Sequence, residues 1–512
     1  MEVVSEQVDG VEDRKSDAVT PSERQERPER GTPEARARVM APPVPREARK
    51  TAAFSSTADG DEADEDLSSF RPRVVTRAAS APDGAPLAFF AGCEWSDLGV
   101  GAELCTALPS IGAPRPSHVQ CAAWKALSAM GASSPHVAIT DAAGSGKTLA
   151  YLVPLVAQLR AAEAAGSPRA IGGCPRVCIL APTSELCSQI LSTCRQLSAA
   201  GIRLRSCAMT GGHAARTQVE AVSEGVDILV ATPGRLATLV QGGAVRMSDC
   251  RALVLDEADV LAGPNSEFKD ALLPILAGLP RGCRRLLVTA TLPEETQAHL
   301  WTELLGGHSP QRATGPNLHK PSAGLEERLV DCSAYGSGDV SASTGSPKVL
   351  SERAVFRRKA EALLRVLGSR ENAGMPSLVF CNTLERCRDV ENYIKRSDRG
   401  GSRLQVHAMH AAISPPMRLA ALQALRVSVP EGKPTPVVVA TDRASRGLDC
   451  AAVGHVVLFD FPRDPSEYVR RVGRTARGAG GTGRVTALVM GPQVNLARQI
   501  MERNADGASL IT

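Results

Sequence analysis

Short apolar runs alternate with longer amphipathic stretches along most of the sequence. The runs are bounded by turn residues and read as buried strands: HVAIT, RVCILAP, VDILVATP, ALVLDEAD, RLLVTAT, SLVFCN, PVVVATD and HVVLFDFP. Buried strands separated by helices predict parallel sheets with helices on both faces. Because the runs fall into two blocks, we expect two α/β domains, at 86–305 and 322–505.

The composition changes outside these two blocks. Residues 1–85 are rich in Glu, Arg, Pro, Ala and Ser, include the acidic run DGDEADEDLSS, and have no apolar periodicity. Such a segment cannot bury enough surface to fold, so we expect a disordered tail. Residues 306–321 read as a linker, and YGSGDVSASTGSP at 335–347 reads as an exposed insertion in the second domain.

Composition also limits the class of protein. The sequence has no run of 18 apolar residues, so we expect no membrane span. Its 14 cysteines form no CxxC pair and no zinc-like array, which predicts reduced thiols in a soluble intracellular protein. The net charge of +4 is compatible with a local basic groove for nucleic acid.

One apolar run leads into a glycine-rich loop and a helix, HVAITDAAGSGKTLAYLVPL. Gly144 and Gly146 let backbone N–H groups approach a phosphate, and Ser145 lies between them. Lys147 can reach the β and γ phosphates, and the hydroxyl of Thr148 can hold Mg²⁺. A chance Gly/Ser turn is the alternative, which the flanking strand and helix disfavour.

A second run, RALVLDEADVL, ends in two carboxylates. Asp256 suits a contact with Mg²⁺ through water, and Glu257 is placed to orient or deprotonate an attacking water. A carboxylate pair after a strand is weak evidence by itself. Together with the glycine-rich loop about 110 residues earlier, it predicts a P-loop NTPase that uses ATP and Mg²⁺.

The stretch YVRRVGRTAR carries four arginines in ten positions. A helix would place Arg470, Arg474 and Arg477 on one side and Arg471 off that stripe. Arginine presents a fork of donors that suits oxyanions, so one interpretation is a phosphate clamp. The other is a solvated basic face or a loose nucleic-acid patch, and the stretch itself does not decide between them.

These motifs, with others in the same order, resemble the DEAD-box RNA helicases. GAPRPSHVQ is similar to the Q motif, APTSELCSQ to motif Ia, TGG to the GG motif, ATPGR to motif Ib, DEAD at 256–259 to motif II, TAT to motif III, LVFCN to motif IV, ATDRASRGLD to motif V and RRVGRTAR to motif VI. The resemblance covers about 90–505. It implies two tandem RecA-like P-loop NTPase domains that hydrolyse ATP to unwind or remodel RNA.

The resemblance also assigns residues to the nucleotide. Gln120 takes the place that reads the adenine edge, Trp95 the place of an aromatic against the base, and Asp449 the place of a ribose contact. Arg474 and Arg477 match arginine fingers, which are worth roughly 10³ to 10⁵ in rate. The expected catalytic set is therefore Lys147, Asp256, Glu257, Arg474 and Arg477.

RNA is the partner that the resemblance implies, held by its sugar–phosphate backbone. The matching residues in the two domains are Thr183, Gly211, Gly212, Thr232, Gly234, Arg235, Arg418 and Thr441. Backbone contacts carry no sequence information, so we expect weak sequence selectivity. For the threonines, turn hydrogen bonding is the alternative. We expect a monomer without a membrane partner, and the sequence does not identify protein partners.

Some positions depart from the family pattern. Asp141 stands where a P-loop has glycine, Ser184 replaces an arginine in motif Ia, and Pro415 replaces a glutamine. Arg470 replaces the histidine that links motif VI to the last Asp of DEAD, so it could pair with Asp259. None of these changes removes a group that acts on phosphate.

Two functions from different classes stay open. The first is an RNA helicase or remodelling ATPase; the second is an ATP-gated RNA clamp or scaffold with little unwinding activity. The intact hydrolytic residues favour the first, and the DEAD and Q motifs disfavour a DNA helicase. DFPRDPSEYVRRVGRTARG is similar to a plant and algal subgroup associated with chloroplasts and ribosomal RNA maturation. Nucleus and cytoplasm are the alternatives, since the acidic N-terminus is unlike a transit peptide.

Overall fold

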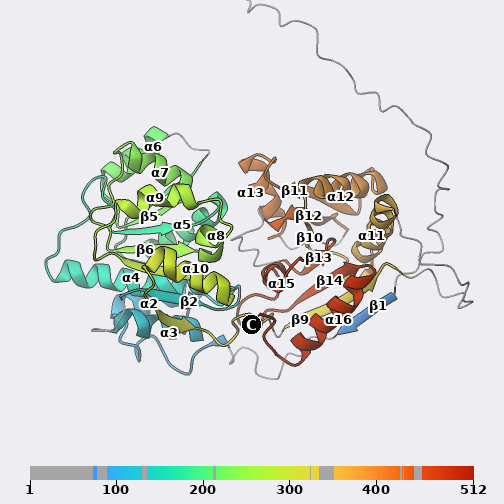
Figure 1. Cartoon of the computed structure of the whole chain (residues 1–512), viewed down its shortest axis with the longest axis horizontal. Coiled ribbons are helices and arrows are strands. Elements are labelled where there is room, and N and C mark those ends of the chain that lie inside the picture. The colour runs from blue at the N-terminus through green and yellow to red at the C-terminus, as the bar shows by residue number, and fades with distance from the viewer. Residues whose placement is uncertain are drawn as a thin grey trace, which may run out of the picture. The chain divides into compact units, whose positions relative to one another are not determined.

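The computed structural model describes residues 73–77, 89–129, 135–211, 215–322, 324–333, 351–426, 429–430, 432–442 and 453–511. These residues form two α/β lobes, each built on a seven-stranded sheet (Figure 1). We call residues 89–315 the N-lobe. Residues 324–511, together with residues 73–77, form the C-lobe.

The N-lobe sheet is parallel, with the strand order β4-β5-β3-β6-β7-β2-β8. Its strands are β2 (Val137–Thr140), β3 (Val177–Leu180), β4 (Ser206–Met209), β5 (Ile228–Ala231), β6 (Ala252–Asp256), β7 (Arg284–Thr289) and β8 (Gln311–Thr314). Its helices are α2 (Ala102–Ser110), α3 (His118–Ser128), α4 (Lys147–Ala164), α5 (Ser184–Ala199), α6 (Ala215–Ser223), α7 (Pro233–Gln241), α8 (Ala258–Ala262), α9 (Lys269–Ala277) and α10 (Glu294–Leu305).

The C-lobe sheet has the order β1-β9-β14-β13-β10-β12-β11 and is parallel except for β1. Its strands are β1 (Arg73–Arg77), β9 (Leu325–Asp331), β10 (Ser377–Cys381), β11 (Leu404–Met409), β12 (Thr435–Thr441), β13 (His455–Leu458) and β14 (Gly483–Val489). Its helices are α11 (Glu352–Leu367), the 3₁₀ turn η2 (Arg370–Asn372), α12 (Leu384–Ser397), α13 (Pro415–Ala424), α15 (Pro465–Val472) and α16 (Pro492–Ala505).

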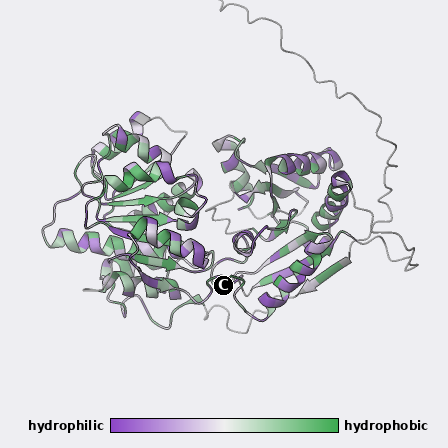
Figure 2. Ribbon diagram, viewed as in Figure 1, coloured by the Kyte–Doolittle hydropathy of each residue, from purple (hydrophilic) through white to green (hydrophobic). Residues whose placement is uncertain are grey.

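Each sheet separates two hydrophobic clusters. In β3, Val177 and Ile179 pack into one cluster, whereas Cys178 and Leu180 pack into the other. This alternation follows from the two-residue period of a strand, and it explains why these runs are apolar at every position. Figure 2 shows the same hydrophobic character along the central strands, with hydrophilic residues on the helices around them. In the part of the chain that the structure describes, no helix combines the length and the hydropathy needed to cross a membrane.

Residues 73–77 correct the expectation that all of 1–85 is a disordered tail. They form β1, which pairs antiparallel with β9 in the register Val75↔Leu329. Val75 packs against the C-lobe core. The segment RVVTR is β-branched at three successive positions, a pattern that favours a strand but is too short to stand out in the composition of an 85-residue segment. The other residues of that segment lie outside the described part.

The lobe boundaries also differ from those expected. The segment 306–321 is not all linker, because β8 pairs with β2 and buries Ala313 in the N-lobe core. The C-lobe extends past residue 505, since Leu510 and Ile511 are buried in its core. The insertion expected at 335–347 lies outside the described residues.

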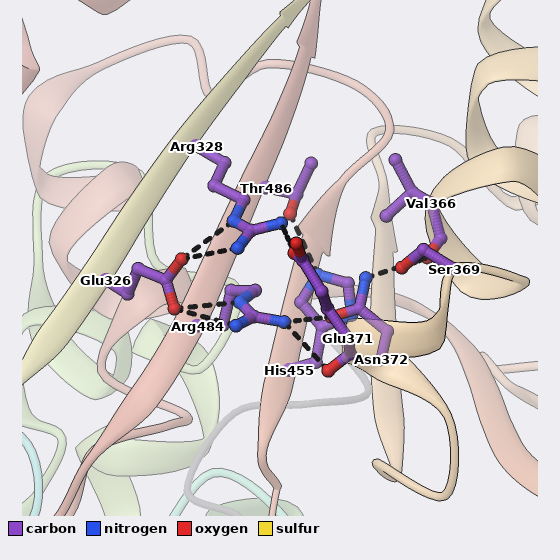
Figure 3. Close-up of polar contacts among 9 residues, drawn as sticks. All are labelled: Glu326, Arg328, Val366, Ser369, Glu371, Asn372, His455, Arg484 and Thr486. Carbon is purple, nitrogen blue, oxygen red and sulfur yellow. Dashed lines mark hydrogen bonds and ion pairs between the residues drawn. The ribbon is translucent and has the colours of Figure 1, made fainter. Parts of the chain in front are cut away.

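A polar cluster lies at the amino ends of the C-lobe strands (Figure 3). We call it the β9–β14 cluster; it consists of Glu326, Arg328, Glu371, Asn372, His455, Arg484 and Thr486. Glu326 accepts hydrogen bonds from Arg328 and Arg484, each at 2.8 Å, on one face of the sheet. The fully buried His455 contacts the Thr486 hydroxyl at 2.9 Å. Burial, then Arg484, lowers the pKa of His455 to about 3.

Candidate nucleotide and RNA site

The expected functional residues follow strands at the carboxyl edge of the N-lobe sheet. Gly211, Thr232 and Thr183 come after β4, β5 and β3, which are neighbours in the sheet. Asp256 ends β6, and Lys147 follows β2 on the other half of the sheet. Parallel strands end at one edge, where α/β proteins bind ligands. The topology therefore places the residues expected to bind RNA and those expected to bind the nucleotide on adjacent halves of a single edge.

The glycine-rich loop needs its glycines. Gly144 has φ +80° and Gly146 has φ +90°, in the left-handed region that glycine adopts without strain. A Cβ at Gly146 would also overlap the Gln120 carboxamide. That carboxamide accepts from the Ser117 N–H at 2.8 Å and donates to the Gly146 carbonyl at 3.1 Å. Gln120 is thus held directly against the loop, on the first turn of α3.

Lys147 lies inside its own loop. Its ammonium donates to the carbonyls of Asp141 at 2.8 Å and Ala142 at 2.7 Å. Burial lowers the pKa of Lys147 to about 8, against the effect of nearby carboxylates. The lysine therefore remains mainly charged at neutral pH and is available to a phosphate group that replaces the two carbonyls.

Asp141, the departure from the P-loop pattern, has a structural role. Its carboxylate accepts from the N–H of Ala142 at 2.8 Å and from the N–H of Asn317 at 3.1 Å. Burial raises the pKa of Asp141. A Cβ at Gly315 would overlap the carboxylate, so the chain after β8 must pass close to it. Asp141 ties the start of the loop to the segment that leaves the N-lobe.

Asp256 and Glu257 form an acidic pair at the end of β6. The Tyr151 hydroxyl donates to Asp256 Oδ2 at 2.9 Å. Burial, followed by the charge of Glu257, raises the pKa of Asp256 to about 6. Glu257 has φ +60°, which is strained for a residue with a Cβ, and its buried Oε2 has no hydrogen-bond partner among the described residues.

This pair fits a divalent cation. A buried carboxylate with a raised pKa and a neighbouring buried oxygen without a partner are both stabilised by positive charge. The Thr148 hydroxyl follows Lys147 at the start of α4, beside the same edge. The donors are oxygens, which Mg²⁺ prefers. Among the described residues, no group of three or more His, Cys, Asp or Glu side chains is placed to hold a metal ion, so the acidic pair would need oxygen donors such as the Thr148 hydroxyl and water.

Asp259 connects three motifs. Its Oδ1 accepts from the Thr289 hydroxyl at 2.8 Å and its Oδ2 from the Thr291 hydroxyl at 3.3 Å. Arg470 Nη1 lies 3.5 Å from Asp259 Oδ2 and 3.4 Å from the Thr291 hydroxyl. The pairing of Arg470 with Asp259 that the sequence suggested is present in the structure. The longer arginine takes up the link that the resemblance assigns to a histidine.

The prediction that a helix aligns Arg470, Arg474 and Arg477 is wrong. Helix α15 ends at Val472 and is capped by Gly473, so Arg474 and Arg477 lie beyond it. Even so, Arg474 Nη2 lies 3.9 Å from Glu257 Oε1. A Cβ at Gly144 would come within 3.0 Å of the Arg477 side chain. Both arginines therefore reach the motif carboxylates and the glycine-rich loop without sharing a helix face.

For Arg471, the sequence left a solvated basic face open, and the structure excludes it. Arg471 is fully buried instead of lying on a solvated face. Its guanidinium donates to Asp442 at 2.8 and 2.5 Å, to Glu467 at 3.1 Å, to the Asp460 carbonyl at 2.7 Å and to Asn382 at 2.6 Å. These bonds tie α15 to the ends of β10, β12 and β13. Arg471 is a structural arginine within the motif.

Motif Ia begins α5. The Thr183 hydroxyl caps this helix by accepting from the Leu186 N–H at 3.3 Å. Glu185, in the first turn, pairs with Arg418 Nε at 3.1 Å. The turn hydrogen bond named as the alternative for Thr183 is therefore present, and Arg418 is engaged by a carboxylate. Neither contact excludes a phosphate, because a helix N-terminus retains further N–H groups.

The GG and Ib loops are joined through Gln218. The Gln218 carboxamide donates to the Thr210 carbonyl at 3.0 Å and accepts from Arg235 Nε at 2.9 Å. Thr232 precedes α7, and Gly234 in its first turn is exposed. Thr441 ends β12 at the carboxyl edge of the C-lobe sheet. Gly212 and Asp449 lie outside the described residues.

Trp95 does not present its ring to a ligand. It is 3% exposed within the N-lobe core, and its indole N–H donates to the Ala113 carbonyl at 3.0 Å. The expected stacking on a base would require the ring to leave that core. The packing instead gives Trp95 a positioning role for the loop before α3.

Sequence reasoning missed Ser117 and Tyr151. Ser117 caps α3 and donates its hydroxyl to the Ser145 carbonyl at 2.9 Å, which attaches α3 to the glycine-rich loop. The pattern Ser-x-x-Gln at 117–120 is a capping box and could have revealed it. Tyr151 lies one turn after Lys147 on α4, where a buried hydroxyl beside Asp256 carries no sequence signal.

Solved structures share this fold. The structure of S. cerevisiae Dbp5 bound to RNA and ADP BeF3 matches with a TM-score of 0.60 and 19% identity, over 80% of this chain and 93% of that one. Mss116p bound to ssRNA and AMP-PNP matches with a TM-score of 0.62, over 80% and 77%. At this identity the likeness shows the fold alone, and it confirms the expected tandem RecA-like architecture.

Sequence comparison gives the family. The family model DEAD/DEAH box helicase matches residues 117–299, and Helicase conserved C-terminal domain matches 358–479. DEAD-box ATP-dependent RNA helicase 50 of Arabidopsis thaliana is 42% identical over 442 residues, or 86% of this chain, and the chain spans about half of that relative's length, 53%. ATP-dependent RNA helicase DBP2 of Encephalitozoon cuniculi is 30% identical over 75% of this chain and 68% of its own length. The chain belongs to the DEAD/DEAH box helicase family.

Proposed function

We propose that the chain is an ATP-dependent RNA helicase that hydrolyses ATP to unwind or remodel short RNA duplexes or RNA–protein complexes. The observation that carries the proposal is the environment of Glu257. Its Oε2 is buried without a partner at the end of β6, and its Oε1 lies 3.9 Å from Arg474. A carboxylate that is short of donors, beside an arginine, can bind and orient a water molecule for attack on a γ-phosphate.

The other nucleotide contacts follow from the same edge. Lys147 would exchange two backbone carbonyls for phosphate oxygens, and Gln120 would read the adenine. Thr148 and Asp256 would hold Mg²⁺, which supplies charge stabilisation at the phosphate oxygens when bound. Arg474 and Arg477 would neutralise the charge that develops on the γ-phosphate, as arginine fingers do. The relatives named as ATP-dependent RNA helicases support this assignment.

RNA would lie along the half of the edge that β4, β5 and β3 form. The loops there offer glycine backbone and helix N-termini, which suit phosphates and not base edges. Dbp5 and Mss116p, which share the fold, have been solved with RNA or ssRNA bound. We infer that this chain binds RNA mainly through its backbone, with weak sequence selectivity.

The proposal is tested by measuring phosphate release from ATP by the purified full chain, with and without a short RNA duplex. Separation of the duplex strands is measured in the same samples. We expect RNA-stimulated hydrolysis and ATP-dependent separation. Glu257→Gln should lower turnover at least about 10²-fold while ATP binding is kept, because glutamine preserves the shape but takes no proton. Glu303→Gln, an exposed change on α10, is the matched control.

A clamp would behave differently in the same experiment. RNA binding that depends on ATP, with hydrolysis too slow for repeated strand separation, would replace the helicase proposal with the ATP-gated clamp. Absence of both RNA binding and ATP binding would overturn both. The retention of Glu257, Arg474 and Arg477 in one neighbourhood favours the helicase.

We also propose a role in ribosomal RNA maturation in the chloroplast. Its support is the plant origin of relatives such as the 42% identical Arabidopsis thaliana helicase and a 41% identical protein of Oryza sativa. Crosslinking in cells followed by sequencing of the bound RNA would test it. Recovery of plastid ribosomal RNA is expected, and recovery of only nuclear or cytoplasmic RNA would contradict it.

A further inference from the structure

Two half-buried cysteines lie in contact, and one of them is on helix α3, which carries Gln120. Cys93 Sγ lies 3.8 Å from Cys121 Sγ, and the two residues are 28 positions apart. Cys121 directly follows Gln120 on the first turn of α3. Of the 13 cysteines that the structure describes, nine are buried and four are half-buried, and this pair is among the four. An oxidant in solution can therefore reach it.

Neighbouring contacts fix the position of Cys93 relative to Cys121. On the Cys93 side, the Ala91 N–H donates to the Pro116 carbonyl at 2.8 Å, and Glu94 pairs with Arg115 at 3.0 Å. Trp95 anchors the same segment in the core. These contacts fasten residues 91–95 to the chain just before α3. The sulfurs need to approach by less than 2 Å to reach disulfide length, about 2.05 Å.

We propose that Cys93 and Cys121 form a reversible disulfide that weakens adenine-nucleotide binding by the N-lobe. The oxidant is a small disulfide or a disulfide-bearing oxidoreductase. The link to nucleotide rests on the function proposed above, whereas formation of the disulfide does not.

The exchange takes two steps. Cys93 directs its S–H toward the sulfur of Cys121, so the two sulfurs already face each other. The Cys121 thiolate attacks one sulfur of the oxidant and expels a thiolate, which gives a mixed disulfide. Cys93 then loses its proton to water and attacks Cys121 Sγ, expelling the second thiolate. The two cysteines lose two electrons, and the oxidant gains them as two thiols.

The consequence for nucleotide follows from the geometry of α3. Gln120 and Cys121 are neighbours on the helix, about 100° apart around its axis. The Gln120 carboxamide is already in hydrogen-bond contact with Ser117 and Gly146. Pulling Cys121 toward Cys93 turns or shifts the first turn of α3 and moves the carboxamide from this position. The group that reads adenine is thereby displaced from the glycine-rich loop.

The test uses the full chain, equilibrated in reduced or oxidised glutathione. Peptide mapping after alkylation should find Cys93 joined to Cys121 in the oxidised sample. Affinity for ADP should be at least about threefold lower than in the reduced sample and should return with dithiothreitol. Because a 28-residue loop is closed, the N-lobe should also melt at a higher temperature. Cys93→Ser should remove all three effects, whereas Cys105→Ser, a half-buried control on α2, should keep them.

Each other outcome counts against the proposal. Failure of the Cys93–Cys121 link to form, or its formation without a change in ADP affinity, would overturn the switch. A threefold loss that persists in Cys93→Ser would assign the effect to another thiol and overturn it too. If the reduced protein bound no ADP, the proposed function would fail, and the switch with it; peptide mapping and melting would still decide whether the disulfide exists.

Discussion

The acidic pair of the N-lobe and the β9–β14 cluster of the C-lobe both bury ionisable groups. They differ in how fully those groups are satisfied by hydrogen bonds and ion pairs. In the cluster, Arg484 donates to Glu326 and to the Glu371 carbonyl (Figure 3). The two ring nitrogens of His455 contact the hydroxyls of Ser377 and Thr486. In the acidic pair, Glu257 has a left-handed backbone and a buried Oε2 without a partner among the described residues. Fully satisfied polar groups stabilise a fold, whereas strained and unsatisfied ones are typical of functional sites.

The position in the sheet agrees with this difference. The acidic pair lies at the carboxyl ends of parallel strands, where ligands bind, and the β9–β14 cluster lies at the amino ends. The cluster should therefore respond to mutation through stability, and the acidic pair through chemistry. Arg471 is the sharpest case for that division, because it lies in a functional motif but is bonded like a member of the cluster.

Arg471→Ala should be the most destabilising change. The fully buried guanidinium pairs with Asp442 and Glu467, so its removal leaves two carboxylates without their cation. Loss of one partner of a buried ion pair costs about 3–5 kcal/mol. Urea unfolding of the C-lobe should show a loss of that size. An unchanged unfolding midpoint would favour the solvated face that the sequence left open for Arg471.

Arg477→Ala should change chemistry instead of stability. We expect kcat to fall at least about 10²-fold, or about 2.7 kcal/mol, with little change in ATP affinity or unfolding midpoint. Arg477→Lys should not restore turnover, since an ammonium cannot reproduce a planar two-pronged contact. If the arginines of this motif form a general basic patch, the variants would instead weaken RNA binding with a shallower salt dependence and keep turnover at saturating RNA.

Asp256→Asn should stabilise the ligand-free protein while it abolishes hydrolysis. The folded pKa of about 6 lies above the ordinary 3.8, so the stability that protonated Asp256 gives is lost as the pH rises through 6. Asparagine stays neutral and keeps an oxygen for the Tyr151 hydroxyl. At pH 7 we expect the N-lobe to gain on the order of 1–3 kcal/mol. A lower unfolding midpoint for Asp256→Asn would mean that the ionised Asp256 carboxylate does not destabilise the folded protein.

The motifs and strands could be predicted because both depend on local pattern. The run before Asp256 is apolar at every position, and its burial on both faces follows from a two-residue period. Gly146 and Lys147 are fixed by the chemistry of a phosphate loop. The grouping of the expected RNA residues on one half of the carboxyl edge and of the expected nucleotide residues on the other could not be predicted, because strand order depends on packing between distant segments.

The missed features depend on where the chain turns or which way a helix faces. Arg471 and Arg474 look alike in sequence, but α15 ends between them, and only its packing against β12 and β13 buries Arg471. Trp95 matches an aromatic position, yet a large ring is most easily accommodated in the core. Strand β1 has a clear pattern but only five residues, and its partner β9 is about 250 residues away.

The smallest predicted effect concerns His455. Burial, then Arg484 and Arg328, lowers its pKa from 6.5 to about 3. Between these values the unfolded chain takes up a proton that the folded chain does not, so the stability due to neutral His455 is complete above pH 6.5 and is lost as the pH falls toward 3. The contribution of Asp256 to the pH dependence of stability has the opposite sign, since the folded state takes up its proton before the unfolded chain does, between pH 6 and 3.8.

The two residues can therefore be separated by pH. His455→Gln keeps one donor and one acceptor for Ser377 and Thr486, so we expect a loss of about 1 kcal/mol or less at pH 7.5. The slope of the unfolding free energy against pH between 6.5 and 4 reports the protons taken up on unfolding, and it should fall by up to one proton in His455→Gln. The change is best measured in the Asp256→Asn background, where the opposing group is absent. Thr486→Val is the matched control, because it removes a hydrogen bond without removing a titrating group. His455→Gln could instead leave the unfolding free energy as dependent on pH as it is in Thr486→Val. The His455 ring would then be charged in the folded protein at these pH values. The β9–β14 cluster would contain an unsatisfied cation, like the unsatisfied carboxylate of the N-lobe.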